Sequence, residues 1–138
     1  KKVKTNVDSG TATFIQDGAV AALSDETHVE KMREEYRIKR DVLVDAFRRI
    51  RLPDCTPEAT IYLWQKVPQG MTSVDFAKKL LSPEIAIVTT PGAWISDKTA
   101  NGLNPGEGYV RFALVPSIKN TREAANRIKK LLPKALLT

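Results

Sequence analysis

Arg111 is a charged residue in the middle of an otherwise apolar segment, Tyr109-Val-Arg-Phe-Ala-Leu-Val115. Aromatic and β-branched residues of this kind favour a β-strand, in which alternate side chains share a face. Arg111 would therefore lie on the same face as Tyr109 and Ala113. A guanidinium keeps its proton, and its burial is costly unless an anion pairs with it. The sequence thus predicts an anion beside Arg111, best a carboxylate held by two parallel hydrogen bonds.

The anion beside Arg111 has two candidate sources. It is either internal, such as Glu107 or an acid on a neighbouring strand, or it belongs to a bound ligand. The residue types alone favour an anion from within the chain, because internal ion pairs are the more common arrangement.

Other catalytic constellations are missing from the sequence. His28 and Cys55 are the only residues of their types, too few for a zinc site. His28 is expected on the surface at a helix start and Cys55 as a loop or packing thiol, so no Cys–His or Ser–His pair is predicted. The glycines at 102, 106 and 108 do not join a strand to a helix, as a phosphate-binding loop requires. We therefore expect no catalytic residue and no metal site in this chain.

Composition indicates an ordinary folded domain. The chain has 138 residues, of which 42% are hydrophobic and 28% charged, with a formal net charge of +6. The basic residues are spread out and lack the interleaved aromatic residues that stack on bases, so most of the charge is predicted to be solvated surface. A single cysteine suits a reducing, cytoplasmic setting, and no apolar run reaches the roughly 18 residues of a membrane span.

The hydrophobic pattern predicts an α/β fold of the α+β-like kind, a three- to four-stranded sheet with helices packed against it. A long spine helix is expected over about 27–51, from an apolar stripe at helical spacing. The other expected elements are a short helix near 15–23, strands at 60–67, 84–90 and around Arg111, a helix over 73–81 capped by Ser73, and a last helix opening at Asn120 or Thr121. Residues 91–108 form a long loop rich in glycine, proline and asparagine.

Four segments in order carry a family resemblance. They are Asn6-Val-Asp-Ser-Gly10 with Phe14-Ile-Gln16, Pro57-Glu-Ala-Thr-Ile-Tyr-Leu-Trp64, Val88-Thr-Thr-Pro-Gly92 and Gly106-Glu-Gly-Tyr-Val-Arg-Phe112. Together they resemble the C-terminal part of a pyridoxal-phosphate-dependent aminotransferase of class I/II, with the aspartate-aminotransferase-like fold type I. The style of the motifs leans towards the diaminopimelate-type branch.

The resemblance implies a division of the chain and a role for Arg111. Residues 1–25 would be the end of the large cofactor-binding domain, and residues 26–138 the C-terminal small domain. Arg111 would bind the α-carboxylate of an amino-acid or 2-oxo-acid substrate, which makes a ligand the favoured anion. The family's cofactor-binding lysine, with its partners for the pyridine ring, lies upstream of this segment. The chain is therefore expected to be inactive alone.

The resemblance also implies a homodimer when the protein is full length, with active sites at the interface. Asn6 and Ser9 would then lie near the partner's site, although the same turn also suits a helix cap. One departure concerns the loop, where Ile95 replaces a phenylalanine that relatives often carry, and the insert at 96–104 follows it.

Two other functions stay open on the sequence. One is a basic module that binds nucleic acid or another anion, with Arg111 paired internally. The other is a non-transaminating member of the same fold, such as a lyase or the effector-binding domain of a regulator.

Overall fold

The computed structural model describes residues 3, 7 and 10–136, without the side chains of 134 and 135. The chain forms two compact units, Lys1–Glu34 and Glu35–Thr138. The first unit contains α2 (Thr13–Leu23), whose residues are all exposed, and the first turns of α3 (Thr27–Arg49). Among the described residues, no helix combines the length and the apolar character that a membrane span requires.

Helix α3 confirms the predicted spine helix and ends two residues earlier than expected. Ion pairs four residues apart run along its exposed side, including Arg37–Asp41 at 3.1 Å and Arg49–Asp45 at 2.8 Å. Arg51 then takes a left-handed backbone conformation, with φ of 62°. The amide of Leu52 donates to the carbonyl of Phe47, which closes the helix before Pro53.

The second unit contains a three-stranded antiparallel sheet in the order β1-β3-β2, which confirms the predicted fold class. The strands are β1 (Tyr62–Lys66), β2 (Thr90–Pro91) and β3 (Tyr109–Ala113). β3 is the central strand and pairs with both neighbours. The residue at its midpoint is Arg111.

The predicted strand at 84–90 is wrong except for its last residue. Ile85 and Ile87 are buried and their neighbours are exposed, which produces the alternation of a strand in the sequence. Their amides, however, donate to Ser82 and Leu80 at the end of the preceding helix, and Ala86 has a φ of 50°. This segment is therefore a turn that folds over that helix, and not a strand in the sheet.

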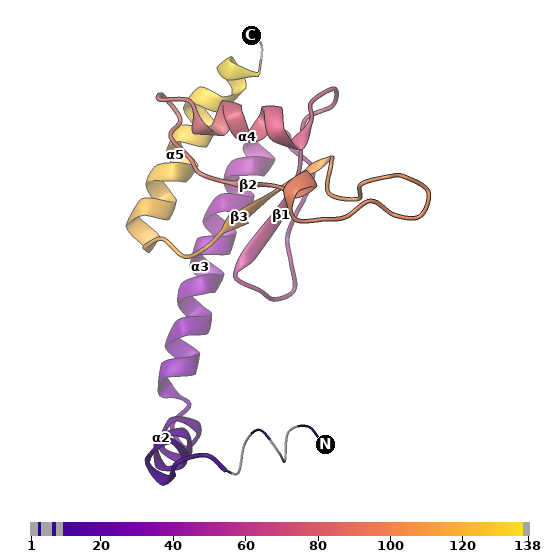
Figure 1. The fold of residues 1–138 in the computed structure, drawn as a ribbon. Coiled ribbons are helices and arrows are strands. Elements are labelled where there is room, and N and C mark those ends of the chain that lie inside the picture. The colour runs from indigo at the N-terminus through magenta and orange to yellow at the C-terminus, as the bar shows by residue number, and fades with distance from the viewer. Residues whose placement is uncertain (1–2, 4–6, 8–9, 137–138) are drawn as a thin grey trace. The chain divides into compact units, whose positions relative to one another are not determined.

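One face of the sheet forms the core together with the helices. The core combines Leu63, Val110 and Phe112 from the sheet with side chains of α3, α4 (Ser73–Leu81) and α5 (Ile118–Ala135). The rings of Phe47 and Phe112 lie 4.9 Å apart, which places α3 directly against β3 (Figure 1). Helix α5 begins two residues before the predicted Asn120.

The cap of α4 differs by one residue from the prediction. The hydroxyl of Thr72, and not that of Ser73, accepts the hydrogen bond from the amide of Asp75, at 3.1 Å. Ser73 is buried, and its hydroxyl accepts a hydrogen bond from the amide of Ala93. The reason is tertiary: Ser73 joins α4 to η1 (Gly92–Trp94), a contact that a local sequence motif does not encode.

Candidate functional site

The sheet has a second face, opposite the core, which we call the outer face. Its side chains come from all three strands, and all are exposed or half-buried: Tyr62, Trp64, Lys66, Thr90, Tyr109, Arg111 and Ala113. The register places Trp64 directly opposite Arg111 on one side, and Thr90 of β2 opposite it on the other. Arg111 therefore lies at the centre of the sheet, where three strands fix its backbone.

The guanidinium of Arg111 has no carboxylate partner among the residues that the structure describes. No ion pair in the described ranges includes it, and its Nε is buried without a hydrogen-bond acceptor. The guanidinium lies over the ring of Tyr62, whose centroid is 4.5 Å from Cζ. A buried donor without a partner costs about 1–3 kcal/mol, so this arrangement favours an anion supplied from outside the described residues.

Two aromatic residues lie beside Arg111 on the outer face. The rings of Trp64 and Tyr109 stack with centroids 5.7 Å apart and an interplanar angle of 15°. Trp64 is 39% exposed, although its ring system is large and apolar. The outer face therefore offers a cation next to an apolar surface, a combination that suits a ligand with a charged end and an uncharged stem.

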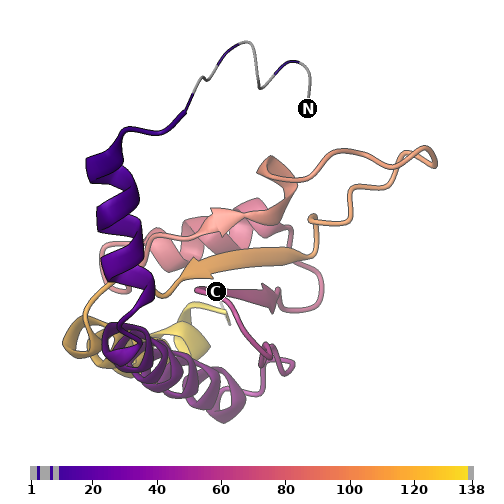
Figure 2. The ribbon, with the colours of Figure 1, turned by 90° about the horizontal axis from the view of Figure 1, so that it is seen from below.

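The loop before β3 is fixed at its base by a single asparagine. The amide of Asn104 donates to the carbonyls of Ala93 and Ser96, at 3.2 Å each, and its carbonyl accepts from the amide of Gly106 at 2.9 Å. The Ser96 hydroxyl also donates a hydrogen bond to the side-chain carbonyl oxygen of Asn104. Beyond this base the loop extends away from the helices, as Figures 1 and 2 show. Hydrogen bonds between Ser96 and Asn104, its first and last residues, thus close the predicted insert at 96–104 at its base.

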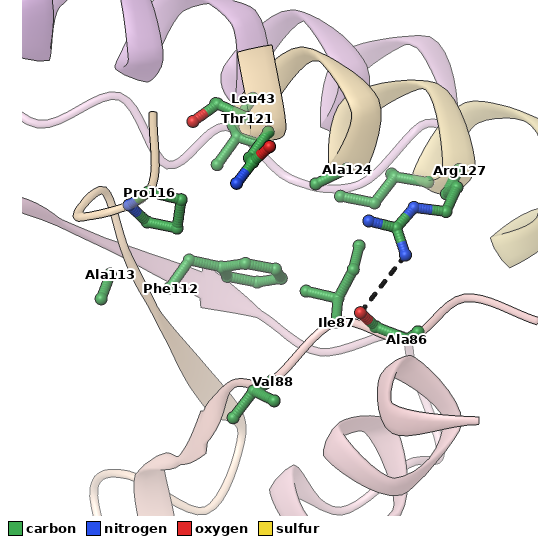
Figure 3. Close-up of a pocket in the computed structure, with 12 residues that line it drawn as sticks. Leu43, Ala86, Ile87, Val88, Phe112, Ala113, Pro116, Thr121, Ala124 and Arg127 are labelled. Atoms are coloured by element: carbon green, nitrogen blue, oxygen red, sulfur yellow. Dashed lines mark hydrogen bonds between the residues drawn. The ribbon is translucent and has the colours of Figure 1, made fainter. Parts of the chain in front are cut away.

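A second arginine lines a cavity on the helix side of the sheet, and its surroundings differ from those of Arg111. The cavity has a volume of about 330 Å³ and is lined mostly by apolar side chains, which come from α3, the turn at 86–88, β3, Pro116 and α5. Figure 3 shows Arg127 pointing from α5 to the backbone of Ala86; its Nη1 donates to the carbonyl of Ile85 at 2.8 Å. Arg127 therefore anchors the turn at 85–87 to α5, which is a structural role.

Of the predicted site residues, the structure describes Arg111 but not Asn6 or Ser9. Arg111 shares a face with Tyr109 and Ala113, as the alternation of its strand predicts, and in the structure this face points away from the core. Asn6 and Ser9 lie outside the described residues. Tyr62 was not singled out by sequence reasoning, although its position two residues before Trp64 in an alternating strand assigns it to the same face.

Comparison with known proteins gives consistent results along the chain. A protein-family model described as aminotransferase class I and II matches residues 1–128. The LL-diaminopimelate aminotransferase of Aquifex aeolicus is 42% identical over 132 residues, which cover 94% of this chain and 32% of that protein. A relative of the same description from Maridesulfovibrio salexigens is 37% identical, with the same coverage. The chain thus spans about a third of the length of these curated relatives.

Solved structures agree with the sequence comparison. An aminotransferase from Neisseria meningitidis Z2491 superposes with a TM-score of 0.82 at 35% identity, over 94% of this chain and 32% of that one. An aromatic aminotransferase from Pyrococcus horikoshii OT3 gives a TM-score of 0.76 at 30% identity, over 91% of this chain and 32% of that one.

Proposed function

This chain belongs to the class I and II aminotransferases, and from that membership we propose that it acts as part of a longer enzyme that transfers amino groups. In this proposal an amino acid donates its amino group and a 2-oxo acid accepts it, with pyridoxal phosphate as the cofactor. Residues 1–25 form the end of the cofactor-binding domain, and residues 26–138 form the small domain. The relatives from Aquifex aeolicus and Maridesulfovibrio salexigens are named LL-diaminopimelate aminotransferases, which suggests LL-diaminopimelate as the amino donor.

The observation that carries the proposal is the guanidinium of Arg111 at the centre of the outer face, which has no carboxylate partner among the described residues. The α-carboxylate is common to amino acids and 2-oxo acids, so one fixed cation serves both substrates of an amino transfer. A planar fork grips a carboxylate through two parallel hydrogen bonds and fixes its orientation. Fixing the carboxylate also fixes the direction of the Cα–H bond, and such orientation lowers the barrier to proton removal.

The described residues fit the substrate carboxylate and not the cofactor. The outer face offers one guanidinium among aromatic rings, whereas pyridoxal phosphate needs a lysine, an acid at the ring nitrogen and a set of donors for its phosphate. We assign these groups to the part of the enzyme that precedes this chain. When bound, the cofactor supplies the electron sink for the reaction, and this chain supplies the grip on the substrate.

The proposal extends to the assembly and its location. We infer a homodimer for the full-length enzyme, with Asn6 and Ser9 near the partner's active site. We also infer a cytoplasmic location and a role in amino-acid biosynthesis, in keeping with the described activity of the relatives.

An amino-transfer assay on the full-length gene product tests the proposal. The protein is supplied with pyridoxal phosphate, LL-diaminopimelate and a panel of 2-oxo acids, and the amino-acid products are measured. Reduction with borohydride, followed by peptide mapping, identifies the lysine that holds the cofactor. We expect amino transfer and a modified lysine outside the 138 residues. A protein that binds no pyridoxal phosphate and transfers no amino group would overturn the proposal.

A further inference from the structure

Tyr62 and Arg111 are diagonal neighbours on the outer face. In the register of β1 and β3, Tyr62 lies opposite Ala113, and Arg111 lies opposite Trp64. Diagonal positions in an antiparallel pair are about 7–8 Å apart at Cα, within the reach of an aromatic ring and a long side chain. The ring centroid of Tyr62 lies 4.5 Å from Cζ of Arg111, so the two side chains close this gap.

Among the neighbours of Arg111 on the outer face, Tyr62 is the residue whose ring covers its guanidinium. Ala113, directly opposite Tyr62, is too small to hold the ring over its own position. Trp64, directly opposite Arg111, stacks on Tyr109 along the parallel diagonal. The pairs Tyr62–Arg111 and Trp64–Tyr109 therefore lie along parallel diagonals of the sheet, and only the first contains a cation.

The ring contact restrains a guanidinium that has little else to hold it. Among the described residues, the buried Nε of Arg111 has no acceptor and no carboxylate forms an ion pair with the guanidinium. A cation over an aromatic face is attracted by the ring quadrupole, and the attraction grows when water is excluded. We propose that Tyr62 is a positioning residue that holds the fork of Arg111 ready for a carboxylate. This inference rests on the proposed role of Arg111.

Preorganisation of this kind changes affinity for the carboxylate more than it changes the fold. An arginine that is already ordered loses less side-chain freedom when it binds, so part of the cost of association is removed in advance. We expect removal of the ring to weaken carboxylate binding by about fivefold to thirtyfold, the range of a partly desolvated cation–π contact. Binding of the cofactor should not change, because the described outer face does not fit it.

The experiment measures binding of propionate, a carboxylate without an amino group, by calorimetry to the full-length gene product loaded with pyridoxal phosphate. Tyr62→Leu removes the ring and should weaken binding, whereas Tyr62→Phe keeps the ring and should bind as the wild type does. Tyr36→Leu is the matched control, because Tyr36 makes the same kind of contact with Lys39, at 5.0 Å, on α3. It should leave propionate binding unchanged.

Arg111→Gln separates failure of the inference from failure of the proposed function. If Arg111→Gln abolishes propionate binding and Tyr62→Leu weakens it, both stand. If Arg111→Gln abolishes binding and Tyr62→Leu leaves it unchanged, the positioning role is overturned and the clamp remains. If Arg111→Gln binds propionate as the wild type does, the clamp is overturned and the role of Tyr62 with it.

Discussion

Gly92 and Gly106 approach each other so closely that neither position has room for a side chain. A methyl group built on Gly92 would overlap the carbonyl oxygen of Gly106, and one built on Gly106 would overlap the carbonyl of Gly92. Both glycines have backbone angles open to other residues, so space and not conformation requires glycine here. The contact joins the end of β2 to the turn before β3, and it thereby fixes the base of the strand that carries Arg111.

The first prediction concerns this contact. Gly106→Ala forces the two backbones apart, and overpacking of this kind costs about 1–3 kcal/mol. The cost should appear as a lower midpoint of thermal unfolding for the full-length protein. Gly18→Ala, on α2, is the control, because a methyl group there meets no atom within 4 Å and alanine favours a helix. Equal midpoints for Gly106→Ala and the wild type would show that the glycine contact is not required.

A second prediction concerns Asn104, which holds the loop base through three residues. Asn104→Ala removes its hydrogen bonds to Ala93, Ser96 and Gly106. The amide of Gly106 then loses its acceptor, so we expect faster hydrogen exchange at Gly106, while Val110 in β3 keeps its protection. Exchange measured by mass spectrometry on short peptides can resolve the two segments. An unchanged rate at Gly106 would contradict the assigned role of Asn104.

The reactivity of Cys55 provides a third prediction, on pH dependence. Burial, together with the nearby carboxylate of Asp54, raises the pKa of the Cys55 thiol from 9.0 to about 11. The thiolate is the reactive form, so at pH 8 its fraction is about a hundredfold smaller than for a thiol of pKa 9.0.

Alkylation of Cys55 by iodoacetamide should therefore be slow at pH 8 in the folded protein and should keep accelerating with pH above 9. The same measurement in urea is the control, since unfolding restores the ordinary pKa and the faster rate. Equal rates in the folded and unfolded states at pH 8 would contradict the raised pKa. Because the folded state prefers the protonated thiol, this preference also stabilises the fold below pH 9 and is lost as the pH rises towards 11.

The sequence predicted those parts of the fold that depend on local pattern. The stripe of α3 repeats at helical spacing over many residues, and the segment around Arg111 is a short run of aromatic and β-branched residues; both elements are present. The segment around Ile85 and Ile87 has the period of a strand, but its burial comes from a turn held by the end of α4 and by Arg127. Two residues in alternation are too few to distinguish these cases.

The site was predictable in part for the same reason. Strand alternation puts Arg111 on one face with Tyr109 and Ala113, but the register that brings Tyr62 over it is a long-range property of two strands. The choice of Thr72 over Ser73 as the cap of α4 also depends on a distant partner, Ala93. Such pairings follow from the packed structure, and a single sequence does not specify them.

The central claim is that Arg111 grips the α-carboxylate of the substrate. The most direct test compares two donors for the full-length enzyme, its amino-acid substrate and the amine that lacks only the α-carboxylate. The value of kcat/KM is measured for both donors in the wild type, Arg111→Gln and Arg111→Lys. Arg111→Lys is informative because it keeps the charge and loses the planar fork.

We predict that both variants lose most of their activity on the amino acid, by about a hundredfold or more, and retain the wild-type activity on the amine. The preference for a carboxylate should thus disappear without loss of cofactor. If the variants lose activity on both donors equally, or on neither, Arg111 does not hold the α-carboxylate.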